Sequence, residues 1–148
     1  MGCAIATAAT IGGITYEEAE SLAGGRTPMQ LRFPRETKRL LEKITQSRWR
    51  WHRIWRPRRL RDIALPTWPV ALFLVNKRFG QWVAAKGRLV HDPEFAFACD
   101  VDEYCRGEWF VTRRLEPADP SKLKTRPRAA FVLKNLATEL SFGEMSVQ

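Results

Sequence analysis

Residues 80–93 read GQWVAAKGRLVHDP, and this stretch decides how the rest of the chain is interpreted. Two short runs with strand character, 81–85 and 88–92, flank Lys86-Gly87. Glycine adopts positive backbone φ angles without steric cost, so this pair suits a tight turn. The stretch therefore predicts a β-hairpin.

Strand signals continue on both sides of this hairpin. Residues 70–76 form a dense apolar run of strand length, VALFLVN, which ends in a turn at residues 76–78. Residues 109–114 predict a further strand, and residues 48–55 alternate large and charged side chains with the period of a strand. A short apolar helix is expected over residues 129–140, after a proline-rich stretch.

Helical signals dominate the N-terminal third. Residues 3–11 are small and apolar and end at two glycines, and Thr15 opens a second helix with Glu18 three residues later, which is a capping box. A third helix is expected over residues 35–44. Helices followed by strands predict an α+β fold, with the helices packed on a small antiparallel sheet in one domain over residues 1–148.

Composition narrows the class of protein. The chain has 148 residues, 45% of them hydrophobic, which favours a globular domain. It contains no apolar run of the roughly 18 to 20 residues that crosses a bilayer, and its start has no signal-peptide pattern, so we expect a cytoplasmic protein without a membrane partner. Cys3, Cys99 and Cys105 lack metal-ligand spacing, so neither metal nor cofactor is expected. A Cys99–Cys105 disulfide is geometrically possible, but a reducing compartment favours free thiols.

The positive charge is concentrated in the middle of the chain. The formal net charge is +9, and residues 26–62 contain thirteen of the 25 Lys and Arg residues but three of the 16 acidic ones. Such asymmetry indicates an anionic partner, with a solvated surface as the alternative.

Two blocks of sequence resemble papain-fold cysteine peptidases. One is GCAIATAATIGGITYEEA over residues 2–19, and the other is the hairpin at 80–93. The most similar group is the bacteriocin-leader peptidases and their small stand-alone bacterial and phage relatives, whose hairpin reads His-Trp-Val-Val…Gly-x-Val-x-Asp-Pro. The resemblance, over about residues 2 to 94, implies a papain-like fold and a peptide or protein substrate. It also implies a nucleophile at Cys3 and an orienting carboxylate at Asp92.

The position of Cys3 suits that chemistry. Cysteine attacks as the thiolate, which the free N–H groups and dipole at a helix N-terminus stabilise. Cys3 heads the predicted Ala-rich helix. Taken alone, a small buried thiol in such a helix is the simpler interpretation; the matching hairpin favours descent from a nucleophile.

The sequence departs from the family pattern at the position of the general base. Gln81 stands where the resemblance implies a histidine, and the family's glutamine several residues before the nucleophile has no counterpart in front of Cys3. Glutamine forms hydrogen bonds but transfers no proton near neutral pH. We therefore expect an inactive or attenuated homologue. Any remaining chemistry would be attack of Cys3 on an acyl or peptide carbonyl, with Gln81 donating to the oxyanion and Asp92 as polar support. His91 is expected to point away from the Asp92 face, and His52 has no motif around it, so neither should replace the base.

Residues 48–61, RWRWHRIWRPRRLR, are termed the Arg–Trp segment below. Alternation places Trp49, Trp51 and Trp55 on one face, most simply a core face, and Arg50 and His52 opposite. Arginine binds phosphate bidentately and tryptophan stacks on bases, so the alternative function is a non-enzymatic module that binds nucleic acid or an acidic protein. Its candidate residues are Arg48, Arg50, Arg53, Arg56, Arg58 and Arg59. No sequence-specific readout is expected, because no nucleic-acid-binding motif is present.

Overall fold

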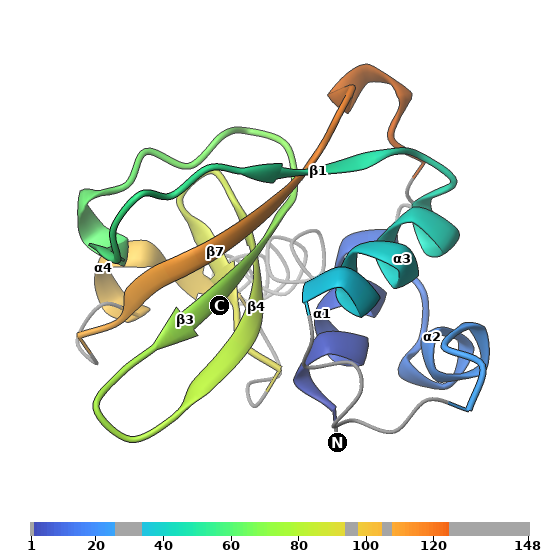
Figure 1. The fold of residues 1–148 in the computed structure, drawn as a ribbon, viewed down its shortest axis with the longest axis horizontal. Helices are drawn as coiled ribbons and strands as arrows, with labels where there is room; N and C mark the ends of the chain where they lie inside the picture. The colour runs from blue at the N-terminus through green and yellow to red at the C-terminus, as the bar shows by residue number, and fades with distance from the viewer. Residues whose placement is uncertain (1, 26–33, 94–97, 105–107, 125–148) are drawn as a thin grey trace, which may run out of the picture.

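Three N-terminal helices pack against one face of an antiparallel sheet in the computed structural model (Figure 1). The structure describes residues 2–25, 34–93, 98–104 and 108–124. The predicted helix at 129–140 and Cys105 lie outside the described residues, so that helix and the state of the Cys99–Cys105 pair stay predictions. The α+β class, with the helices first, is confirmed.

The three predicted helices form close to their expected bounds. They are α1 (Cys3–Gly12), α2 (Tyr16–Leu22) and α3 (Pro34–Thr45). α1 ends at Gly13, whose φ of 68° closes the helix in the left-handed region. The capping box that opens α2 is present: the Thr15 hydroxyl accepts the Glu18 N–H, and the Glu18 carboxylate accepts the Thr15 N–H.

The sheet has seven strands, and every pairing is antiparallel. They are β1 (Trp49–His52), β2 (Arg58–Arg59), β3 (Val70–Val75), β4 (Gly80–Lys86), β5 (Leu89–His91), β6 (Cys99–Asp100) and β7 (Phe110–Pro117). Their order is β1-β7-β3-β4-β5-β6, and β2 also pairs with β7. The sheet includes two short strands that were not expected from the sequence, β2 and β6.

The central hairpin is confirmed as β4 and β5, joined through Gly87 at a φ of 59°. β5 is short and pairs with residues 84–86 of β4. The first residues of β4 therefore lie beyond the end of β5, and α1 packs next to this part of the sheet.

Two apolar cores cover the two faces of the sheet. The α1-side core joins the three helices to strand residues that include Trp82, Ala84 and Leu115. The α4-side core lies between the opposite sheet face and the short helix α4 (Val101–Tyr104), and it includes Leu72 and Val83. The alternation of Trp82 and Val83 between the two cores follows from the two-residue period of a strand.

Among the described helices, none combines the length and the apolar character needed to cross a bilayer. The described ranges also hold no group of three or more His, Cys, Asp or Glu side chains placed to bind a metal ion.

Candidate functional site

Cys3 is the first residue of α1, and the helix brings its thiol to the start of β4. Gly2 precedes it as the N-cap, and the Gly2 N–H donates to the Tyr16 hydroxyl at 3.0 Å, which ties the beginning of α1 to α2. The Trp82 backbone N–H donates to Cys3 Sγ, with 3.5 Å between nitrogen and sulfur. This contact places the sulfur of Cys3 against the backbone of β4.

Gln81, Asp92 and Tyr104 form a closed triangle of hydrogen bonds beside this strand. Gln81 Nε2 donates to Asp92 Oδ2 at 2.6 Å and to the Tyr104 hydroxyl at 2.7 Å. The Tyr104 hydroxyl donates in turn to Asp92 Oδ2 at 2.6 Å. All three residues are buried. The hairpin brings Asp92, just after β5, back beside β4, and α4 supplies Tyr104.

The triangle fixes the orientation of the Gln81 amide. An ionised carboxylate only accepts hydrogen bonds, and a phenol has one proton to donate. Since Tyr104 gives its proton to Asp92, Nε2 must face both partners, and Oε1 faces away from them. The expectation that Gln81 donates to an oxyanion stays a prediction.

Tyr104 is held in its protonated form. Burial raises the pKa of the Tyr104 hydroxyl far above its ordinary value, and the hydrogen bond to Asp92 and the charge of that carboxylate raise it further. Tyr104 therefore donates to Asp92 throughout the neutral range.

The thiol and the Gln81 amide approach β4 from different sides. Gln81 alternates with Trp82 along the strand, and its side chain meets Tyr104 in the α4-side core, whereas Trp82 belongs to the α1-side core. In the described part of the chain no hydrogen bond joins Cys3 to the Gln81 side chain. The structure thus joins Gln81 directly to Asp92 and brings Cys3 to the next residue of the same strand.

The two histidines occupy other places. His91 Nδ1 lies 3.3 Å from the Thr10 hydroxyl, seven residues along α1 from Cys3. That spacing corresponds to about 10 Å along a helix axis. His52 lies on β1, at the far edge of the sheet from β5. These placements agree with the expectation that neither histidine replaces the base.

The Arg–Trp segment is a strand for only part of its length. Trp49 is buried, but Trp51 is 40% exposed and Trp55, beyond the end of β1, is 78% exposed. The expectation of a core face with three tryptophans is therefore wrong for Trp51 and Trp55. β1 ends at His52, so the alternation stops before Trp55. The six candidate arginines of the segment are all exposed: Arg48, Arg50, Arg53, Arg56, Arg58 and Arg59.

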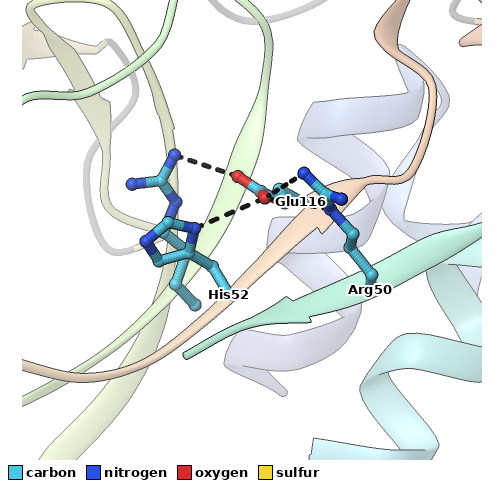
Figure 2. Close-up of polar contacts among 4 residues, drawn as sticks. Arg50, His52 and Glu116 are labelled. Atoms are coloured by element: carbon cyan, nitrogen blue, oxygen red, sulfur yellow. Dashed lines mark hydrogen bonds and ion pairs between the residues drawn. The ribbon is translucent and has the colours of Figure 1, made fainter. Parts of the chain in front are cut away.

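A second buried carboxylate organises the other face of β1. Glu116 on β7 lies between Arg50 and His52, which reach it from the neighbouring strand (Figure 2). Glu116 Oε1 is 3.1 Å from Arg50 Nη2 and 3.4 Å from His52 Nδ1, and Oε2 is 3.0 Å from Arg114 Nη2. Arg50 and His52 therefore share one face, as the alternation predicted.

Sequence reasoning missed Tyr104, Arg114 and Glu116. Tyr104 lies in a four-residue helix and reaches Gln81 across 23 positions, which no local pattern reveals. Arg114 and Glu116 interrupt an otherwise strand-like run, FVTRRLEP. Charged residues two apart in a central strand are a usable signal for an internal ion pair, because buried charges are paired.

Comparison of the chain with protein-family models, with curated proteins and with solved structures gives no match. The resemblance to papain-fold peptidases therefore stays a prediction, carried by the two sequence blocks alone.

Proposed function

We propose that this chain is a papain-like cysteine peptidase homologue that keeps the positions of the nucleophile and the carboxylate and lacks the general base. The observation that carries the proposal is the hydrogen bond to Asp92 from Gln81 on β4, whose next residue, Trp82, donates its N–H to Cys3 Sγ on the other side of the strand. In the family's hairpin pattern, a histidine stands at the position of Gln81. The Gln81 amide donates a hydrogen bond to the Asp92 carboxylate, as the N–H of that imidazole would.

The chemistry of an amide at this position makes the site inactive or strongly attenuated. Attack on a peptide carbonyl forms a bond from Cys3 sulfur to carbon, and the departing amine must receive a proton. Histidine takes that proton from the thiol and returns it to the amine. Gln81 does neither, and general acid–base catalysis is worth about 10²- to 10⁴-fold in rate.

The free acceptor of Gln81 gives the site a binding role. With Nε2 bonded to Asp92 and Tyr104, Oε1 can accept a hydrogen bond from an N–H donor, such as a peptide backbone. A peptide ligand that binds at the start of β4 and is released unchanged is the function that this acceptor supports best.

The test restores the base and follows the thiol. In a background with Cys99→Ser and Cys105→Ser, we expect Gln81→His to alkylate faster at Cys3 than the parent at pH 6 to 7, because an imidazolium stabilises the thiolate. The measurement is the rate of iodoacetamide modification across pH, followed by intact mass. Adding Asp92→Asn to Gln81→His should remove the increase in alkylation rate. Gln81→Asn, which supplies no base, should alkylate no faster than the parent.

Two outcomes would contradict the proposal. One is a folded Gln81→His protein that alkylates like the parent at every pH, which would mean that Cys3 and position 81 do not form one site. The other is a parent chain that cleaves peptides with a Cys3-dependent rate that Gln81→His does not raise.

A further inference from the structure

A basic hollow lies at the end of β1, away from Cys3. It has a volume of about 450 Å³, and its lining comprises His52, Arg53, Ile54, Trp55, Arg56, Pro57, Arg58, Ile63 and Arg114. Arg114 alternates with Leu115, which belongs to the α1-side core, so the hollow opens on the sheet face opposite α1.

The hollow is cationic and retains unused donors. Of the described residues that line it, none is acidic. Arg53, Arg56 and Arg58 are exposed, and they form no ion pair within the described ranges. An anion entering here would meet three guanidinium groups without displacing a carboxylate from them.

Arg114 adds a buried donor to the lining. Its residue is 8% exposed, and its Nη2 group is bound to Glu116. Its Nε atom is buried and has no hydrogen-bond partner in the described part of the chain. A buried donor without a partner costs free energy, which a bound acceptor oxygen would recover.

An aromatic platform adjoins these charges. Trp55 is 78% exposed, and the Arg53 guanidinium lies over its ring at 3.8 Å from the ring centroid. The Arg53 guanidinium thus already makes a cation–π contact with one face of the indole. Unstacked bases bind to such planes, and guanidinium groups bind the phosphates between them.

We propose that the basic hollow binds single-stranded nucleic acid, with phosphate at Arg56, Arg58 and Arg114 and a base stacked at the Trp55–Arg53 pair. An acidic peptide would use the arginines but would gain nothing specific from an exposed indole. Paired bases in a duplex cannot present their faces to Trp55, so a single strand is the form that fits. The site shares no residue with the Cys3 site and does not depend on the proposed function.

The test is fluorescence anisotropy with a labelled oligo-deoxythymidine of about 12 nucleotides, because stacking and phosphate contacts both contribute to such binding. We expect Trp55→Ala to weaken binding about tenfold, and Trp55→Phe to recover part of the loss because it restores an aromatic plane. Replacing Arg56 and Arg58 by Ala should reduce the slope of log affinity against log salt by about 1.4, since each neutralised phosphate contributes about 0.7.

The matched control is Arg35→Ala. Arg35 is an exposed arginine on α3, which packs in the α1-side core on the other sheet face, so its loss removes one positive charge, as Arg56→Ala alone does, at a distance from the hollow. We expect this variant to retain the parental affinity and salt slope, and Cys3→Ala to bind like the parent.

Three results would overturn the proposal. The first is a duplex of the same length that binds as tightly as the single strand. The second is an oligo-glutamate peptide that displaces the oligonucleotide while Trp55→Ala, confirmed folded by circular dichroism, has no effect. The third is an equal loss of affinity in Arg35→Ala and in the Arg56 and Arg58 variant, which would indicate general charge attraction.

Discussion

Asp92 and Glu116 are both buried carboxylates, yet the side-chain donors that the structure describes around them differ in charge. Asp92 accepts from the neutral amide of Gln81 and the neutral hydroxyl of Tyr104. Glu116 is bound by Arg50 and Arg114, which are cations, and by His52. Neutral donors hold a carboxylate in place without supplying charge. Cationic partners make Glu116 a structural anchor for the Arg–Trp segment.

The largest effect is expected from removing the Glu116 carboxylate. Glu116→Ala should lower the free energy of unfolding by about 4 kcal/mol, because it leaves Arg114 buried without its partner. Urea denaturation measures the loss. Combining it with Arg114→Met should recover part of the stability, since the buried cation is then absent. A loss below about 1 kcal/mol would show that Glu116 does not anchor this region.

Replacing each carboxylate by the amide of the same shape removes its charge and compares the two sites most directly. Glu116→Gln should cost about 2 kcal/mol, because its hydrogen bonds to cations lose their charge assistance. Asp92→Asn should cost about 1 kcal/mol or less, because its neutral donors lose little when the acceptor becomes an amide oxygen. Equal losses in the free energy of unfolding, measured in parallel urea denaturations, would show that the two sites do not differ in this way.

A smaller effect is expected when the Asp92 triangle loses one edge. Tyr104→Phe should lower the free energy of unfolding by about 1 kcal/mol, since it deletes the hydroxyl that donates to Asp92 and accepts from Gln81. Thermal or urea unfolding measures this change. Tyr16→Phe is the matched control, because it removes the other phenol of the chain, which bonds to the backbone of Gly2. A Tyr104→Phe protein that is more stable than the parent would contradict a stabilising role for these hydrogen bonds.

The Tyr104 hydroxyl also predicts how the stability of the protein changes at alkaline pH. An unfolded tyrosine releases its proton near pH 10.0, whereas burial and Asp92 raise the pKa of Tyr104 in the folded protein. Stability from Tyr104 is therefore fully present below pH 10.0 and is lost as pH rises above it, because the unfolded chain alone loses the proton. Ultraviolet titration of the folded protein should show one of its two tyrosines resisting ionisation, and Tyr104→Phe should remove that resistant signal.

Local sequence signals predicted much of the fold. The glycines after α1, the capping box at Thr15 and the Gly87 turn each act within a few residues, and all three are confirmed. The Gln81–Asp92 contact was also accessible, because it lies within one hairpin whose register the turn sets.

The remaining features depend on contacts between distant residues. The length of β1 is set by its pairing with β7, and Trp51 is exposed although it alternates with Arg50 as predicted. Glu116 meets Arg50 across 66 positions of sequence. Periodicity shows which residues share a face, but not how far a helix covers that face or which strand lies beside it.

The shortness of β5 makes the Trp82 amide a spectroscopic reporter. Because β5 pairs with residues 84–86, the Trp82 N–H meets the Cys3 sulfur. Any chemical change at that sulfur alters the hydrogen bond that this N–H makes. Its NMR signal and its exchange with solvent deuterium therefore report the chemical state of the Cys3 thiol without a substrate, in the parent chain and in each variant at position 81.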